Sequence, residues 1–315
     1  EAGAEARGRR LGGGKTSVRI DRMLADESRR LAAMHRTQVH RDPWPDFASF
    51  DASAYSKKLL RTAAVQWAGR ARAEHGSVHQ FSELTHALSE ARAPLQLLGS
   101  LGRLITDEVR HAELCSEMAL VCGSTLPDEP HTFRWPIPRA PWKPAPHPAD
   151  GDEEAVHLWA ADAVMTACCL GETLSKPMLD GIATVTTDPV AEAVAAQILR
   201  DEHLHSAFGW EALEYLLGKL NDESREELQH RLGRRLWGFE KSTCLGIPIE
   251  DVAETEIVIA PSAEPNLGTL TDMQYAMMFF HTMEQEILPK FRELGLDADR
   301  AWGERLSHRA AAKSS

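Results

Sequence analysis

The sequence lacks the cysteine pairs that bind zinc or build a disulfide framework. Its five cysteines are an odd number and contain no C-x-x-C motif, which excludes a zinc ribbon. It also lacks an uncharged apolar run near the ~18 residues that span a bilayer, because Asp162 interrupts the longest candidate, residues 158–171. No basic segment followed by an apolar run opens the chain, so we expect no secretory signal and a reducing, cytoplasmic location.

Positive charge is also scarce. The 315 residues include 35 lysines and arginines against 47 aspartates and glutamates, which gives a net charge of −12. This balance disfavours a nucleic-acid-binding protein, which needs a basic face, and it disfavours docking on an acidic membrane surface. Hydrophobic residues make up 43% of the chain, enough for the buried core of one large domain or two modest ones.

Alternating β-branched residues are rare, whereas apolar residues recur at steps of three and four. This periodicity predicts an all-α protein. Capping residues mark two helix starts: Asp188 followed by Pro189, and Thr271 followed three positions later by Gln274. We expect six helices, at about residues 55–89, 94–122, 152–182, 188–217, 221–241 and 271–295.

Proline divides the helical region. Residues 126–148 contain eight prolines, a density that no helix or central strand tolerates, so we expect a long irregular crossover there. Short turns join the helices on either side of it into two antiparallel hairpins. Two hairpins joined by one long crossover is the connectivity of a ferritin-like four-helix bundle, here with additional C-terminal helices. We divide the chain into a flexible tail (1–15), an N-terminal extension (16–54), the bundle with a fifth helix (55–243) and a C-terminal extension whose helix packs on the bundle (244–315).

Five Glu-x-x-His motifs suggest a metal site, because residues three apart share one face of a helix. Roughly one such motif is expected by chance at this composition. The five are Glu83/His86, Glu108/His111, Glu154/His157, Glu202/His205 and Glu227/His230. Only the second and the fourth belong to a longer Asp-Glu-x-x-His pattern and lie on apolar stripes of their helices. A carboxylate in a core stripe is costly unless it is paired or coordinated, so these two motifs are the predicted metal ligands.

The height of residues along the hairpins adds two more carboxylates. In an antiparallel hairpin, residues equidistant from the turn lie at one level. Glu74 is matched in this way with Glu108 about residue 91, and Glu172 is matched with Glu202 about residue 187. Choosing Glu83 instead of Glu74 would displace the carboxylate by nine residues, or ~13 Å.

Four glutamates and two histidines are therefore expected to converge. The predicted ligands are Glu74, Glu108, His111, Glu172, Glu202 and His205. This is the ligand set of ferritin-like di-iron and di-manganese carboxylate proteins. Four carboxylates carry a charge of −4, which two divalent cations neutralise, whereas without cations some glutamates would take up protons. Asp107 and Asp201 each precede a ligand glutamate, and we expect them to fix the rings of His205 and His111, respectively.

The stretches Ala71–Val78 and Asp107–Ala112 resemble a bacterial ferritin-like group within the ferritin-like di-iron carboxylate superfamily. The resemblance covers about residues 55–218. Three departures narrow it. The chain has no rubredoxin-like cysteine pairs and has Ser175 where rubrerythrins carry a further glutamate. Cys115 stands where the small subunit of ribonucleotide reductase usually has its radical tyrosine, and no histidine near Glu172 matches the additional ligand of arylamine N-oxygenases.

The resemblance implies an oxidoreductase, a non-haem di-iron oxygenase or oxidase in which the same six ligands are the catalytic residues. Two iron ions would activate O₂ to hydroxylate or N-oxygenate a small organic substrate held in an apolar pocket, although the ligand types also permit a manganese–iron pair. The electrons would come from an external ferredoxin or reductase, and a homodimer is compatible with the sequence. Two alternatives stay open: a ferroxidase or peroxide-detoxifying iron-handling protein, and a non-catalytic helical protein stabilised by metal.

Overall fold

The computed structural model describes residues 29–126, 148, 152–254 and 259–314. The chain divides into two compact units, residues 1–44 and 45–315. In the first unit, residues 29–39 are helical, and the ring of His40 stacks on that of Trp44 with the centroids 3.7 Å apart. The expected tail, 1–15, and almost all of the expected crossover, 126–148, lie outside the described residues.

Every regular element within the described ranges is a helix, so the all-α prediction is confirmed for them. None of these helices combines the length and the apolar character that crossing a bilayer requires. The elements of the second unit, in chain order, are η1 (Phe47–Ser49), η2 (Ala52–Ala54), α2 (Lys57–Glu90), α3 (Leu95–Gly123), α4 (Glu153–Val164), η3 (Met165–Glu172), α5 (Thr173–Val185), α6 (Pro189–Leu217), α7 (Asp222–Cys244), α8 (Ile249–Ala253), α9 (Asp272–Thr282), η4 (Met283–Ile287), α10 (Leu288–Glu293) and α11 (Ala298–Ser314).

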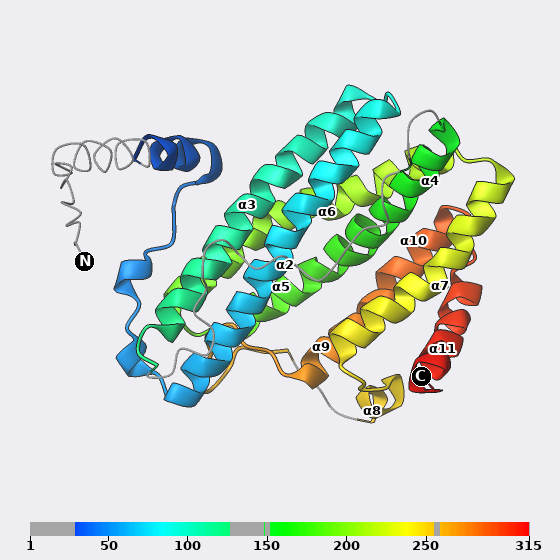
Figure 1. Ribbon diagram of the computed structural model, residues 1–315. Coiled ribbons are helices and arrows are strands. Elements are labelled where there is room, and N and C mark those ends of the chain that lie inside the picture. The colour runs from blue at the N-terminus through cyan, green and yellow to red at the C-terminus, as the bar shows by residue number, and fades with distance from the viewer. Residues whose placement is uncertain (1–28, 127–147, 149–151, 255–258, 315) are drawn as a thin grey trace, which may run out of the picture. The chain divides into compact units, whose positions relative to one another are not determined.

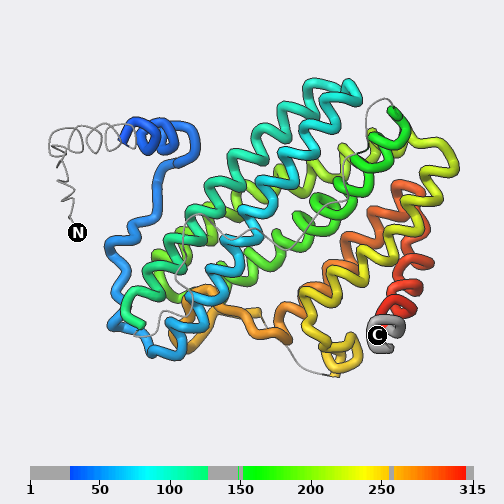
Figure 2. Tube along the Cα trace, in the orientation of Figure 1, coloured from blue at the N-terminus to red at the C-terminus, as the bar shows by residue number. Residues whose placement is uncertain are grey.

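Two long hairpins carry all the predicted ligands (Figure 1). α2 and α3 are joined by residues 91–94 and pack along each other, while α6 packs against the continuous helix made of α4, η3 and α5. Contacts of α3 with α6, and of α2 with α4, join the two hairpins. The Cα trace in Figure 2 shows these four helical rods running side by side. Side chains from all four can therefore meet between the hairpins.

The helix starts follow from the capping residues of the sequence. Ser56 caps α2, and its side chain accepts a hydrogen bond from a backbone N–H of the first turn. Asp188 accepts two such bonds at the start of α6, which begins at Pro189 as predicted. Thr271 and Gln274 form the predicted capping box at the start of α9. Local capping chemistry therefore sets these helix starts.

The expected third helix, 152–182, is not a uniform α-helix. Residues Met165–Glu172 form a π-helical segment, η3, between α4 and α5. Gly209 of α6 lies against this segment, because a Cβ atom there would stand 2.6 Å from the Cβ of Cys168 and 2.9 Å from its carbonyl carbon. Only glycine allows so close an approach of the two helices. π-helical segments are frequent at functional sites, and this one ends at the predicted ligand Glu172.

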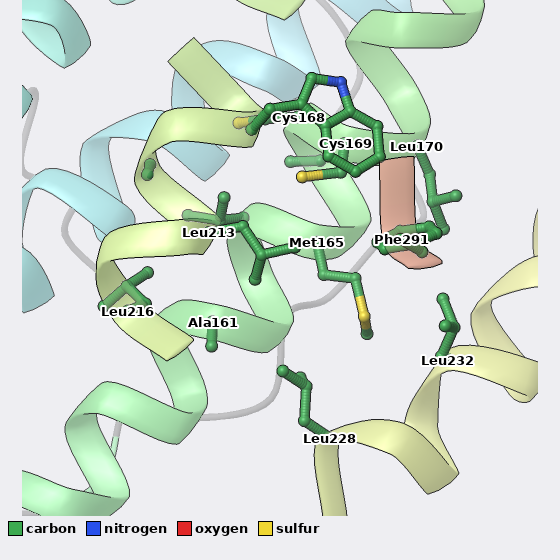
Figure 3. Close-up of a cluster of buried hydrophobic side chains, with 14 of the residues drawn as sticks. Ala161, Met165, Cys168, Cys169, Leu170, Leu213, Leu216, Leu228, Leu232 and Phe291 are labelled. Carbon is green, nitrogen blue, oxygen red and sulfur yellow. The ribbon is translucent and has the colours of Figure 1, made fainter. Parts of the chain in front are cut away.

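The C-terminal helices add a further core outside the hairpins. Figure 3 shows buried side chains from α4, η3, α6, α7 and α10 meeting there. The labelled residues are Ala161, Met165, Cys168, Cys169, Leu170, Leu213, Leu216, Leu228, Leu232 and Phe291. The expected fifth helix is α7, and the expected sixth helix is the run of α9, η4 and α10. The sequence did not predict α8 or α11. α11 packs on α7, where Arg305 donates to the carboxylate of Glu240 at 2.7 Å.

Candidate metal centre

The six predicted ligands come from four helical segments and lie together between the two hairpins. α2 carries Glu74, α3 carries Glu108 and His111, η3 carries Glu172, and α6 carries Glu202 and His205. Five of the six are buried, and the side chain of Glu74 is 15% exposed. The convergence that the hairpin geometry predicted is therefore present as an arrangement of side chains.

The ring of His205 lies among three carboxylates. Its Nδ1 atom is 3.1 Å from Oε1 of Glu108 and 3.3 Å from Oε2 of Glu172. The distance from the same nitrogen to Oε2 of Glu202 is 3.9 Å. Nδ1 is thus the atom with which this histidine faces the glutamates.

The ring of His111 faces the glutamates in the same way from α3. Its Nδ1 atom lies 3.8 Å from Oε2 of Glu74, 3.9 Å from Oε1 of Glu108 and 3.7 Å from Oε1 of Glu202. The ring centroids of His111 and His205 are 5.5 Å apart. Glu108 and Glu202 therefore lie close to both histidines, whereas Glu74 lies beside His111 alone among these short contacts.

Two overlapping groups within this cluster could each hold a metal ion. They are Glu108 with His111 and His205, and Glu172 with Glu202 and His205, and the ligand atoms of each lie within 4.8 Å of one another. Glu74 belongs to neither group. The four carboxylate oxygens of Glu108 and Glu202, and Nδ1 of His111, have no hydrogen-bond partner among the described residues. Buried polar atoms without partners are costly, so this donor set fits a bound cation, which would satisfy them.

Electrostatics within the cluster favour protons wherever no cation is bound. Burial raises the pKa of Glu108 and of Glu202 well above the usual range, and the charge of Glu172 adds to both shifts. Burial opposes protonation of His111, but the carboxylates of Asp201 and Glu74 outweigh it and raise the pKa of the ring to about 10. A divalent cation must displace protons from such groups in order to bind.

The same balance holds on the other side of the cluster. Burial acts against protonation of His205, but Asp107, Glu108 and Glu172 raise the pKa of its ring far above the usual range. Burial also acts against ionisation of Glu74, but the adjacent His111 lowers the pKa of this carboxyl. Protonated histidines and neutral glutamates can thus coexist in the metal-free cluster.

Each histidine turns its second nitrogen toward one of the predicted aspartates. Oδ2 of Asp201 lies 3.3 Å from Nε2 of His111, and Oδ2 of Asp107 lies 3.6 Å from Nε2 of His205. Both aspartates are buried. The pairing matches the expected partners, and the part that it plays in fixing the two rings stays a prediction.

Arg110 is a candidate residue that the sequence pattern did not reveal. It is 2% exposed, and its Nη1 atom lies 2.7 Å from Oδ1 of Asp107 and 2.6 Å from Oδ2 of Asp201. Arg103 donates its Nε–H to the carboxylate of Asp107 at 2.7 Å. Burial opposes ionisation of Asp107, but His205, Arg103 and Arg110 together lower its pKa to about 2. The one signal in the sequence was the three-residue spacing of Asp107 and Arg110.

A pocket of about 760 Å³ reaches the cluster from one side. Glu74 and Glu172 line it, whereas Glu108 and Glu202 are not among its lining residues. Its walls come from α2, from η3 with the start of α5, and from α7. The lining includes polar side chains such as Gln80 and Thr166, so the pocket is not the purely apolar one that we expected.

The other three Glu-x-x-His motifs lie outside the cluster, and several of their members pair locally. Glu83 pairs with His79 at 3.1 Å, His86 with Glu90 at 3.6 Å, and His230 with Glu226 at 3.3 Å, while Glu154 accepts a hydrogen bond from the backbone of Asn221 at 3.0 Å. Choosing among the five motifs by their apolar stripes therefore separated the clustered pairs from the local ones.

Comparison with known proteins adds no relative. No protein-family model matches the chain, and no curated protein or solved structure matches it significantly.

Proposed function

We propose that this protein is an oxygen-activating non-haem di-iron enzyme of the ferritin-like type. The observation that carries the proposal is the meeting of four glutamates and two histidines from both hairpins, with unpartnered carboxylate oxygens at its middle. A pocket that reaches two of these glutamates provides access for a reactant. The connectivity supports the same assignment, because α2–α3 and α4–α6 are hairpins separated by a long connection.

The ligands divide into three pairs by position. His111 and His205 would each hold one metal ion through Nδ1, because Nε2 faces an aspartate. Glu108 and Glu202 lie near both histidines and would be shared between two ions. A bound ferrous pair would supply the electrons with which O₂ is first reduced.

The remaining pair faces the reactants. Glu74 and Glu172 line the pocket and would stand between the metal ions and a bound organic molecule. Asp107 and Asp201 would keep the proton on Nε2 of each histidine and so hold the rings in place. Arg110 lies between these two aspartates and would keep both of them ionised. Turnover would also need electrons from a separate ferredoxin or reductase.

The test is anaerobic loading with two equivalents of ferrous iron, followed by rapid mixing with O₂ and measurement of absorbance and oxygen consumption. We expect about one O₂ consumed per pair of iron ions, with a transient absorption band that decays faster when the substrate is present. A variant with Glu108→Gln and Glu202→Gln should not react at this rate. Absence of oxygen consumption by the loaded wild-type protein would support the non-catalytic alternative instead.

The polar pocket also favours a second candidate, iron handling. Polar side chains that lead to Glu74 and Glu172 would let ferrous ions enter as well as an organic molecule. In that case repeated additions of ferrous iron and O₂ should build up ferric iron beyond two ions per chain. An oxygenase should stop at two.

A further inference from the structure

The pocket beside the candidate metal centre has one wall with a distinct chemical character. α7 contributes Arg234, Arg235, Gly238, Phe239 and Ser242 to its lining. The chain as a whole carries a net charge of −12, so two adjacent arginines on a pocket wall are a local reversal of its charge. The size of the pocket, about 760 Å³, is within the range of sites that hold small organic ligands.

The two arginines differ in what they already bind. Arg235 donates to both carboxylate oxygens of Asp162, at 3.0 and 2.7 Å. Arg231 also reaches this carboxylate, at 3.3 Å, so Asp162 is fully used. Arg234 makes no ion pair with any residue in the described ranges and remains exposed at the pocket. Its guanidinium is thus the cation of this wall that is available for a ligand.

We propose that the pocket binds an organic anion whose carboxylate pairs with Arg234, while its apolar part lies along Phe239 toward Glu74 and Glu172. The guanidinium group presents a planar pair of donors that matches a carboxylate. Phe239 supplies an aromatic surface in the same wall. The inference names the substrate class of the proposed oxygenase and so rests on that function.

The opposite end of the pocket decides when such an anion can bind. Glu74 and Glu172 are carboxylates, and they repel an anion unless cations at the cluster neutralise them. Binding should therefore depend on metal loading as well as on Arg234. This double dependence separates a built site from nonspecific attraction to a surface arginine.

The test uses the full chain loaded with zinc, which is divalent and cannot turn over O₂. Calorimetric titration compares phenylacetate, 3-phenylpropionate and octanoate with the neutral primary amide of each. We expect at least one carboxylate to bind at least tenfold more tightly than its amide, and to lose this advantage when zinc is removed. Failure of all three carboxylates to bind the zinc-loaded protein better than their amides would overturn the proposal.

Substitutions then locate the contact. Arg234→Met should weaken carboxylate binding at least tenfold and leave the amide unchanged, because charge-assisted hydrogen bonds are lost. Arg234→Lys should retain most of the binding. Lys241→Met removes a positive charge from the same helix outside the lining residues and should change nothing. Equal effects of Arg234→Met and Lys241→Met would refute the pairing with Arg234.

A blocking variant tests the pocket without touching any charge. A Cβ atom added at Gly238 meets no atom within 4 Å, so Gly238→Leu can fill the space without a clash. Gly99→Leu on α3 is the matched control, since a Cβ there is equally unobstructed and lies outside the pocket. We expect Gly238→Leu alone to abolish carboxylate binding, and retained binding would contradict the site. Because zinc replaces iron, anion binding can succeed even if oxygen consumption fails, so the two proposals are judged separately.

Discussion

The removal of Arg110 is a direct test of how the buried charges of the centre are held. This side chain is almost fully buried and contacts Asp107 and Asp201 at 2.7 and 2.6 Å, one carboxylate from each hairpin. Loss of one member of a buried ion pair typically costs ~3–5 kcal/mol, because the remaining charge stays desolvated. We expect Arg110→Met to lower the free energy of unfolding of the metal-free protein by about that amount.

The matched control is Arg103→Met. Arg103 also contacts Asp107, at 2.7 Å, but its side chain is 43% exposed, so water can replace part of the interaction. We expect this variant to lose about 1–2 kcal/mol. Urea unfolding at pH 7 measures both variants. The reasoning is refuted if Arg110→Met costs less than about 1 kcal/mol, or no more than Arg103→Met.

The pH dependence gives the same test a second axis. A carboxyl whose pKa is lowered on folding adds stability above its unfolded pKa and loses it as the pH falls through the folded value. For Asp107 the change from 3.8 to about 2 corresponds to about 2 kcal/mol. Arg110→Met raises this pKa, so the difference in unfolding free energy from wild type should narrow between pH 6 and pH 4. A difference that widens in this range would contradict the assignment.

Three further outcomes follow from the geometry. Gly209→Ala should destabilise the fold by ~1–3 kcal/mol in thermal or urea unfolding, because the new Cβ meets backbone atoms at 2.9 and 3.1 Å, whereas Gly99→Ala meets none and should be neutral or stabilising. Asp201→Ala should weaken metal affinity about 10–100-fold in competitive chelator titrations by freeing the ring of His111, and unchanged affinity would remove the positioning role. The raised pKa values of His111 and Glu108 favour the protonated native state, so the unfolding temperature of the metal-free protein should fall as pH rises from 6.5 toward 10, whereas bound metal should flatten this slope; a metal-free protein that becomes more stable over this range would contradict the shifts.

Much of the candidate centre could be predicted from the sequence because its signals are local. A glutamate and a histidine three residues apart stand out when they interrupt an apolar stripe, as Glu108 and His111 do on α3. Glu74 and Glu172 could be found because hairpin geometry fixes which residues share a level. Helix starts such as Pro189 could be located from caps, since capping depends on neighbouring residues alone.

What the sequence did not predict depends on contacts between distant segments. The partner of Arg110 on α6, Asp201, is 91 residues away, and no local pattern indicates such a pair. The π-helical η3 is matched to the close approach of Gly209, which follows from packing and not from propensity. The polar pocket wall depends on where α7 docks against η3, so the expectation of a purely apolar pocket had no local basis.

Metal content is the most direct measurement of the proposed centre. The metal-free chain is titrated anaerobically with ferrous iron and washed, and iron and protein are then quantified. Two ions should remain per chain, and Glu108→Gln combined with Glu202→Gln should retain none tightly. Glu154→Gln and Glu227→Gln, in motifs outside the cluster, should leave the content at two. Fewer than two ions in the wild-type protein, or full retention by the doubly substituted protein, would contradict a di-iron centre at these side chains.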